Sequence, residues 1–341
     1  MNALNQFRKN ITQKLTKSCT NKFQNIDFKG VKSILIIRPN HRLGNILLIT
    51  PLVEEVVTHF PNAQIDLFVK GQVSQIIFEN HPKVNEIFSL PKKHFKQLHL
   101  YLLTWFKLLF KKYDLVINAH EASSSGRLAT KLVNSKCKFF GFSNQNNYEI
   151  ENDYKHIAKQ IIYSFRGYLL NLQPNLVFQP ISKITMPLSD AELESGKEKL
   201  SLLFKNDKPT ICFFTFATGS KCYDKVFWNE FYQKMKIAFE PRFNLLEILP
   251  VENCSQIDFI SENFYSKDVR EIASLLHHTV LFIGADSGMM HLASSATTTL
   301  GLFKVTSPIK YQPYGGSNLG LFTEDLEIND IIDKVKSIVE L

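Results

Sequence analysis

Residues 33–60 read SILIIRPNHRLGNILLITPLVEEVVTHF, and this stretch holds the pattern that decides the fold. Residues 33–37 form an apolar run of the kind expected in a strand whose two faces are both buried. A polar loop follows at 38–45, and we expect an apolar helix over 46–60 that is kinked or started at Pro51. Strand, loop and helix in this order are the building unit of a parallel α/β sheet.

The same alternation continues along the chain and predicts an α/β fold with two similar halves. In the first half we expect strands at 33–37, 65–69, 86–90, 115–118 and 138–142, with helices at 46–60, 72–80, 95–111 and 127–133. In the second half, where Ser189 and Glu192 can form a helix capping box, we expect strands at 210–214, 244–249, 280–283 and 299–303, with helices at 227–239, 268–276 and 288–295. Two such halves imply a cleft between them, the usual place for a ligand.

Three prolines at positions 174, 180 and 187 lie in the segment that joins the halves. We therefore divide the chain into four parts. These are a basic amphipathic segment at 1–30, a first Rossmann-like domain at 31–172, a second Rossmann-like domain at 173–325, and a final helix at 326–341 that we expect to pack back on the first domain.

The composition is that of a globular protein with a localised excess of positive charge. The chain has 341 residues, 44% hydrophobic and 21% charged, which excludes a disordered or fibrous protein and suits about two domains. Its net charge is +8, and the basic residues are concentrated at 1–30 and 92–112. A nucleic-acid-binding protein more often spreads its positive charge over the folded body, so we expect no nucleic acid partner.

The two basic stretches suit an anionic membrane surface or an acidic acceptor, because each combines lysines with apolar residues. The alternatives are that 1–30 is a frayed tail or a helix packed on the body, and that 95–111 is a solvated face over a buried stripe. The apolar stretch at 98–110 is too short to span a bilayer, and the N-terminus lacks the apolar core of a signal peptide. The five cysteines are scattered without C-x-x-C spacing, which argues against disulfides and zinc and favours the cytoplasm.

The most specific local motif is GADSGMMH at 284–291, where a strand ends and a helix begins. Backbone N–H groups at such a helix start favour an anion, and the Ser287 hydroxyl and Gly288 lie at that start. The alternative is that Asp286 only caps the helix and that His291 is a core histidine.

A second loop, TFATGSKCYDK at 215–225, offers groups that can hold a phosphate: hydroxyls such as those of Thr218 and Ser220, the backbone at Gly219, and the two lysines, Lys221 and Lys225. The loop does not match the P-loop pattern, and the first strand–helix loop lacks the glycines of a dinucleotide-binding fingerprint. The chain also lacks H-E-x-x-H, G-x-S-x-G and D-x-D motifs. The simplest protease, hydrolase and metal-dependent transferase interpretations are therefore excluded.

Several of these motifs together resemble the heptosyltransferase family, glycosyltransferase family nine. The resemblance covers roughly residues 32–315, and it is carried by ILIIRPNHRLGNILLITP at 34–51, KVFWNEF at 225–231, DSGMMHLA at 286–293, TSP at 306–308, YG at 314–315, and Arg127 and GF at 141–142. It implies a GT-B architecture, in which two Rossmann-like domains face across a cleft and the second holds a nucleotide diphosphate sugar.

The resemblance also implies roles for single residues. Lys225 would neutralise the donor diphosphate, Ser287 and Gly288 would donate hydrogen bonds to it, and His291 would support them. Asp286 would accept hydrogen bonds from hydroxyls of the donor sugar, and Glu252 would hold the ribose. Transfer of this kind needs no metal ion, since helix dipoles and cationic side chains stabilise the leaving nucleotide. No cofactor beyond the donor substrate is expected.

The chain departs from the family pattern where the family has the Asp of its L-G-D motif, because this position is Asn45. An amide cannot accept the acceptor's proton, although it can orient the acceptor hydroxyl. His41, four residues earlier, and Glu121 are the alternative bases. A second departure is Lys304, which stands where the family has glycine.

The sequence therefore predicts an inverting, metal-independent glycosyltransferase in the cytoplasm, at the inner face of the membrane. It would move a heptose-like sugar from a nucleotide diphosphate to lipopolysaccharide or another acidic surface glycolipid. Two alternatives stay open at this point. One is a non-catalytic homologue that binds nucleotide sugars or acts as a scaffold, which Asn45 suggests, and the other is a sugar-nucleotide epimerase of the same fold.

Overall fold

The computed structural model describes residues 11–92, 96–142 and 153–340. It divides into two compact units, Met1–Ser182 and Lys183–Leu341. The segment after residue 172, which the sequence analysis assigned to the second domain, belongs to the first unit as far as Ser182. A buried ion pair contributes to this, because Arg166 binds both oxygens of Glu55 at 2.7 and 2.8 Å and also donates to the Gln179 carbonyl.

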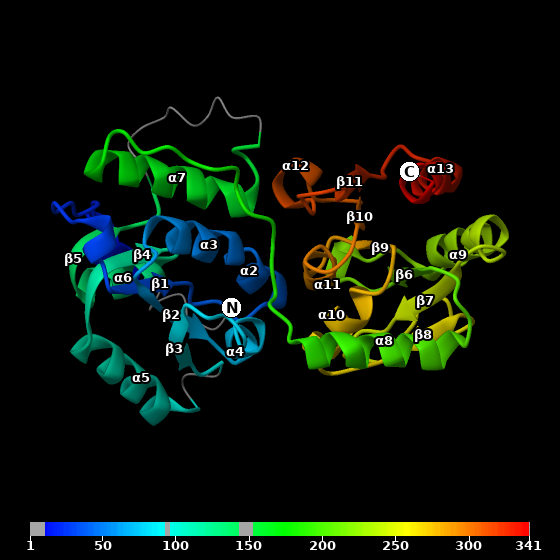
Figure 1. Ribbon diagram of the computed structural model, residues 1–341, viewed down its shortest axis with the longest axis horizontal. Coiled ribbons are helices and arrows are strands. Elements are labelled where there is room, and N and C mark those ends of the chain that lie inside the picture. Colours follow the sequence, from blue (N-terminus) through cyan, green and yellow to red (C-terminus); the bar gives the residue numbers. More distant parts are fainter. Residues whose placement is uncertain (1–10, 93–95, 143–152, 341) are drawn as a thin grey trace. The chain divides into compact units, whose positions relative to one another are not determined.

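The first unit is a five-stranded parallel sheet with helices on its faces (Figure 1). Its strand order is β3-β2-β1-β4-β5. The elements are η1 (Phe28–Gly30), β1 (Ser33–Ile37), α2 (Leu43–Leu47), α3 (Thr50–His59), β2 (Gln64–Lys70), α4 (Val73–Ile77), β3 (Val84–Leu90), α5 (Leu98–Phe110), β4 (Lys112–Asn118), α6 (Ser124–Leu132), β5 (Asn134–Phe139) and α7 (Ile157–Leu172).

The second unit is a six-stranded parallel sheet in the order β11-β10-β9-β6-β7-β8. Its elements are α8 (Asp190–Phe204), β6 (Thr210–Phe214), η3 (Gly219–Lys221), α9 (Lys225–Phe239), β7 (Asn244–Ile248), β8 (Glu262–Phe264), α10 (Val269–Leu276), β9 (Leu281–Ala285), α11 (Gly288–Ala293), β10 (Thr299–Phe303), α12 (Pro308–Tyr311), β11 (Leu319–Phe322) and α13 (Ile328–Val339). Both units therefore have the doubly wound strand order of Rossmann-like domains.

The helix expected at 46–60 is two helices: α2 ends at Leu47, and α3 begins at Thr50, directly before Pro51. Proline has no N–H to donate to the carbonyl four residues earlier, so a continuous helix would leave the Leu47 carbonyl without its partner. The Thr50 hydroxyl donates to that carbonyl at 2.9 Å instead. Pro51 then stands in the first turn of α3, where a missing N–H costs nothing.

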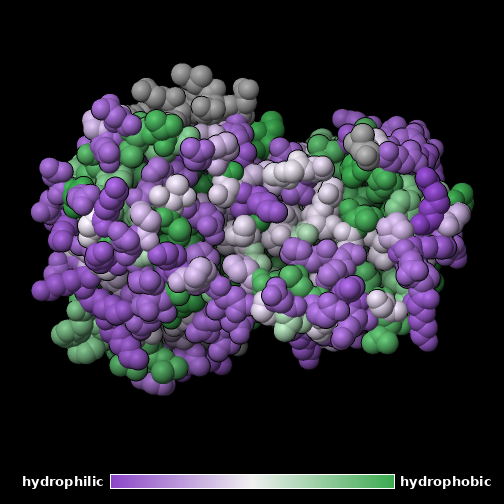
Figure 2. All heavy atoms as spheres, in the orientation of Figure 1, coloured by the Kyte–Doolittle hydropathy of each residue, from purple (hydrophilic) through white to green (hydrophobic). Residues whose placement is uncertain are grey.

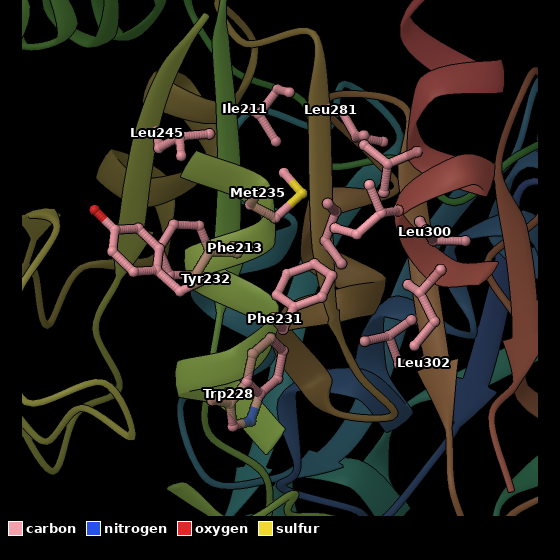
Figure 3. Packing of buried hydrophobic residues seen from close by; sticks show 14 of the residues in the cluster. Ile211, Phe213, Trp228, Phe231, Tyr232, Met235, Leu245, Leu281, Leu300 and Leu302 are labelled. Atoms are coloured by element: carbon pink, nitrogen blue, oxygen red, sulfur yellow. The ribbon is translucent and has the colours of Figure 1, made fainter. Parts of the chain in front are cut away.

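The core of the second unit lies between α9 and the sheet. Trp228, Phe231 and Met235 recur at helical spacing on one face of α9 and are fully or almost fully buried. Figure 3 shows this face against side chains of four strands, β6, β7, β9 and β10. Burial of a single large apolar side chain contributes roughly 1.5–3 kcal/mol, so this cluster is a main source of stability for the unit.

The C-terminal helix packs within the second unit, which differs from the sequence-based expectation that it packs on the first domain. Ile331, Ile332 and Val335 of α13 are buried in the same cluster as the apolar face of α9. Ile331 and Ile332 precede Val335 by four and three positions, about one helical turn, so the three residues form a stripe that α9 covers.

The described part of the basic N-terminal segment, residues 11–30, packs on the first unit. Phe23 stacks on Tyr168 with ring centroids 4.8 Å apart, and the Asn21 side chain bonds to the backbone of residues 140 and 142. The Lys22 backbone forms a β-bridge with Lys138. This is the packed alternative that the sequence analysis left open, and residues 1–10 lie outside the described residues.

Candidate functional site

The strand order places one candidate site in each unit. In a doubly wound sheet, loops at the carboxyl ends of the two strands where the order reverses diverge and leave room for a ligand. In the second unit these strands are β6 and β9, and in the first unit they are β1 and β4. The loops that the sequence analysis selected, 215–225, 284–291 and 38–45, follow β6, β9 and β1.

In the second unit, three adjacent strands bring Asp286 together with two partners from distant parts of the sequence. The Asp286 carboxylate, which is buried, accepts a hydrogen bond from the Lys221 ammonium group at 2.5 Å and another from the Thr306 hydroxyl at 2.7 Å. Lys221 follows β6, Asp286 follows β9, and Thr306 follows β10. The Lys221 ammonium also lies 5.6 Å from the centre of the Tyr311 ring. Asp286 is thus held in a fixed orientation by a partly exposed cation and a hydroxyl.

Directly after Asp286, the chain turns into the short helix α11. Ser287 is its N-cap, and its hydroxyl accepts from the Met290 N–H at 3.3 Å. Ser287 and Gly288 are half-buried, whereas His291 is 4% exposed and packs inside the unit one turn further on. The structure therefore brings Asp286, Ser287 and Gly288 together at one strand end, with His291 behind them.

The loop after β6 is less closely tied to this cluster than the sequence suggested. Thr218 and Ser220 are exposed and precede Lys221, with Thr218 as the N-cap of η3. Lys225 begins α9, where it is exposed and forms an ion pair with the exposed Asp258. Lys221, rather than Lys225, is the lysine that contacts Asp286.

Glu252, the residue suggested for the ribose, is exposed in the turn after β7, in the stretch 251–254. Lys304, which replaces the family's glycine, is exposed, and its ammonium group lies 5.8 Å from the centre of the Tyr223 ring. Neither side chain contacts Asp286 in the part of the chain that the structure describes.

The sequence analysis named Lys221 only as one of the two lysines of its loop, and it did not single out Thr306 or Glu247 as site residues. Glu247 binds the loops that follow β6 and β7. Glu247 lies in β7 with no exposed surface, and its carboxyl accepts hydrogen bonds from Thr215 at 2.7 Å and Ser255 at 2.8 Å. Thr215 begins the loop after β6, and Ser255 belongs to the loop after β7. An acidic residue in an otherwise apolar strand was the available sequence signal.

In the first unit, Asn45 belongs to a small polar network at the end of β1. Its side-chain oxygen accepts from the Arg38 guanidinium at 3.4 Å, and its amide group donates to Asn40 at 3.2 Å. The Asn40 oxygen also accepts from the Arg42 N–H, which starts α2. Arg38 is buried, and burial lowers the pKa of its guanidinium to about 10.

His41 lies in the same loop with its side chain exposed. Partial burial of the ring, followed by the positive charges of Lys70, Lys92 and Arg42, lowers the pKa of His41. A lowered pKa keeps the imidazole neutral near pH 7, which is the form that accepts a proton.

Glu121, the other candidate base, follows β4 and lines a cavity of about 660 Å³ beside residues 13–19. Arg127, one of the residues behind the resemblance, lines the same cavity and donates to the Glu121 carbonyl and to Thr16. Because Arg127 lies in α6 and donates to Thr16, it connects the N-terminal segment to this helix.

Comparison with known proteins agrees with this geometry. Residues 267–331, which carry Asp286 and Thr306, match the model of glycosyltransferase family 9 (heptosyltransferase). Over 289 residues the chain is 22% identical to lipopolysaccharide heptosyltransferase 3 of Escherichia coli K12, covering 80% of this chain and 82% of that protein. The chain is thus similar to proteins of glycosyltransferase family 9.

Solved structures of the family have the same fold. The family 9 glycosyltransferase from Veillonella parvula matches with a TM-score of 0.70 at 16% identity, covering 92% of each chain. The E. coli heptosyltransferase WaaC with ADP matches with a TM-score of 0.66 at 14% identity, covering 89% of this chain and 99% of that one. The expected GT-B fold is thereby confirmed, and the enzyme class is glycosyltransferase.

The buried carboxyl of Glu247 should make the stability of the second unit depend on pH. Burial raises the pKa of Glu247 above its ordinary value of 4.5, against the lowering effect of its hydrogen bonds. Because the folded pKa is the higher one, the stabilising contribution is fully present below about pH 4.5 and is lost as the pH rises through the folded pKa. Glu247→Gln should therefore gain stability relative to the natural chain as the pH rises over this window.

Urea unfolding from pH 4 to pH 8 measures this difference. Thr215→Val is the matched control, since it removes a hydrogen bond but keeps the carboxyl, so its stability should still fall as the pH rises. A constant gap between Glu247→Gln and the natural chain across the range would contradict the assignment.

Proposed function

We propose that this protein is an inverting, metal-independent glycosyltransferase that moves a heptose-like sugar from a nucleotide diphosphate to an acidic surface glycolipid such as lipopolysaccharide. The observation that carries the proposal is the Asp286 cluster, which lies at the reversal of strand order and within the segment that matches the family. The E. coli relatives are named for lipopolysaccharide and heptose, and one solved structure is WaaC with ADP-2-deoxy-2-fluoro heptose.

In the proposed donor site, Asp286 accepts hydrogen bonds from hydroxyls of the donor sugar. Its contacts with Lys221 and Thr306 support this role, because they orient the carboxylate and offset its charge near a diphosphate. Ser287 and Gly288 lie beside it, where backbone N–H groups favour the phosphates. Lys225, with Thr218 and Ser220 before it, would then add positive charge at the start of α9, exchanging exposed Asp258 for the diphosphate.

The proposed reaction is a single displacement at the anomeric carbon of the sugar. The acceptor hydroxyl forms the new bond on one face while the bond to the diphosphate oxygen breaks on the other, so the configuration inverts. Cationic groups and N–H donors take up the charge of the leaving nucleotide, which supplies what a metal ion would otherwise supply. The chain has no D-x-D motif for such an ion.

The proton of the acceptor hydroxyl goes to His41 in this proposal, because Asn45 has no basicity. Asn45 instead orients the acceptor, held in place by Arg38 and Asn40. The named relatives are transferases, so they give no support to the non-catalytic alternative that Asn45 raised.

We further propose that the enzyme attaches to the inner face of the membrane through α5. Among the described residues, no helix combines the length and apolar content that crossing a bilayer requires. The α5 helix nevertheless buries only Leu108, and hydrophobic residues are visible over it at the lower left of Figure 2. Seven of its apolar side chains are 40–72% exposed: Leu98, Leu100, Leu102, Leu103, Phe106, Leu109 and Phe110.

The exposed lysines Lys96, Lys107 and Lys112 border this apolar face and suit anionic lipid headgroups. Lys111 does not contribute, because it is bound to Asp66 and Glu86 at 2.9 and 2.6 Å. The alternative for this segment was a solvated face over a buried apolar stripe. In α5, however, most of the apolar side chains are themselves exposed.

For the donor site, Lys225→Ala should weaken binding of a nucleoside diphosphate about 10- to 100-fold, the effect of a charge-assisted contact of roughly 1.5–3 kcal/mol. Titration calorimetry on the full chain measures the dissociation constant. Lys236→Ala, on the exposed surface of the same helix, is the matched control and should bind as the natural chain does. Equal affinity of all three proteins would remove Lys225 from the site.

For the base, His41→Ala should lower kcat by about 10²–10⁴-fold, the usual contribution of a general base, and leave donor affinity unchanged. Asn45→Asp should preserve or raise kcat, since it restores a carboxylate. Turnover of the donor with a glycolipid extract as acceptor gives both values. A His41→Ala enzyme with full kcat would show that the proton goes elsewhere.

For the membrane, the double variant Phe106→Ser, Phe110→Ser should lower partition onto anionic vesicles by about a hundredfold or more, since each buried Phe contributes roughly 1.5–3 kcal/mol. Flotation with vesicles measures the bound fraction, which should also fall with salt. Ile237→Ser is the control, because Ile237 is 81% exposed on α9. Unchanged flotation of the double variant would count against α5.

A further inference from the structure

The carboxyl edge of the first unit's sheet carries several positive charges. Strands β1, β2 and β3 are neighbours, so the residues at and just after their ends, Arg38, Lys70 and Lys92, lie along one edge. His41 lies among them, and its pKa is lowered by partial burial of the ring and then by the charges of Lys70, Lys92 and Arg42. This edge is the one at which open α/β sheets bind their ligands.

Two of these side chains converge at Gly71, just after β2. A Cβ atom built at Gly71 would lie 2.9 Å from Lys92 Cε and 3.3 Å from His41 Cβ, so both side chains pass close to the same backbone atom. Gly71 also has φ = +71°, a conformation that favours glycine. The close approach of loop 38–45 and Lys92 therefore depends on a position without a side chain.

Arg38 is the buried member of the group, and its charge lacks a described counter-ion. Its exposed fraction is 7%, and its Nε atom has no hydrogen-bond partner among the described residues. Within those residues its guanidinium donates one side-chain hydrogen bond, to the neutral Asn45 oxygen at 3.4 Å. Within 11–92, 96–142 and 153–340, no carboxylate forms an ion pair with Arg38, Arg42 or Lys92. A buried guanidinium normally has such a partner, because removing the charge from water is costly.

The amide at position 45 explains why Arg38 lacks a negatively charged counter-ion among the described residues. A carboxylate at position 45, which is the family pattern, would face Arg38 across the same contact and form an ion pair with it. The amide keeps the shape of that side chain and removes its negative charge. The substitution therefore leaves one additional positive charge at the edge of the sheet.

We propose that Arg38, together with His41 and Lys92, forms an anion-binding subsite that takes a phosphate or carboxylate group of the acceptor, and that Asn45 keeps this subsite cationic. The inference rests on the proposed function, because it assigns the anion to the acceptor glycolipid. The planar guanidinium suits bidentate binding of either group, and Lys92 adds a second charge at the exposed end. Asn45 is then a specificity-determining residue, and its replacement of Asp has a binding consequence.

The experiment is a calorimetric titration of the full chain with inorganic phosphate and, separately, with a hexose phosphate. Both should show saturable binding, with the hexose phosphate the tighter ligand. Asn45→Asp, which supplies Arg38 with an internal counter-ion, should weaken both by at least about tenfold, the scale of one charge-assisted contact. Asn45→Ala, the matched control that adds no charge, should retain binding, and Arg38→Gln should lose it.

Three outcomes would overturn the subsite. They are unchanged phosphate binding in Asn45→Asp, equal affinity for inorganic and hexose phosphate, and loss of all phosphate binding in Lys225→Ala, which would assign the anion to the donor site. In turnover assays, the proposed subsite predicts that Asn45→Asp raises KM for the acceptor, whatever its effect on kcat. Because anion binding is read without turnover, failure of the subsite is distinguishable from failure of the proposed transferase.

Discussion

Burial of the central strands on both faces is the constraint on which the rest of this structure depends. β1, β6, β9 and β10 are almost entirely buried, so they have no face on which a polar side chain can meet solvent. The charged groups of the two candidate sites consequently lie in the loops beyond the ends of these strands. The strand order then selects which loops meet, and it brings Lys221 to Asp286 although they are separated by 65 positions in the sequence.

The two strand-end sites differ in how their charges are balanced. In the second unit, Asp286 has both a cation and a hydroxyl as partners, so the site is internally compensated before any ligand arrives. In the first unit, Arg38 faces a neutral amide. A carboxylate that is already paired is suited to accept hydrogen bonds from sugar hydroxyls, whereas an uncompensated buried cation gains most from a ligand that brings its own negative charge.

Much of the fold follows from local patterns, whereas the site partners depend on long-range strand order. The apolar runs at β1, β6, β9 and β10 predicted these strands nearly residue by residue, and the family motif located Asp286 and Ser287. The sequence analysis placed no strand at β8 or β11, because these are short, partly exposed and without a long apolar run. Lys221 was one of two lysines in the loop after β6, and the adjacency of β6 and β9 alone does not distinguish them. The three-dimensional contacts do, because Lys221 pairs with Asp286 whereas Lys225 pairs with Asp258. Glu247 was missed because its partners, Thr215 and Ser255, lie on different loops.

The proposals for His41 and Arg38 are linked through electrostatics. The cations that lower the pKa of His41 belong to the same edge that would receive the acceptor's anion. A bound phosphate or carboxylate opposes those cations, so it would raise the pKa of His41 and make the imidazole a stronger base when the acceptor is in place. Basicity would thus be supplied in part by the substrate, which offers a physical reason why the loop can function with an amide at position 45. A carboxylate there would be a base in its own right, but it would also occupy Arg38 and weaken the site for the anion.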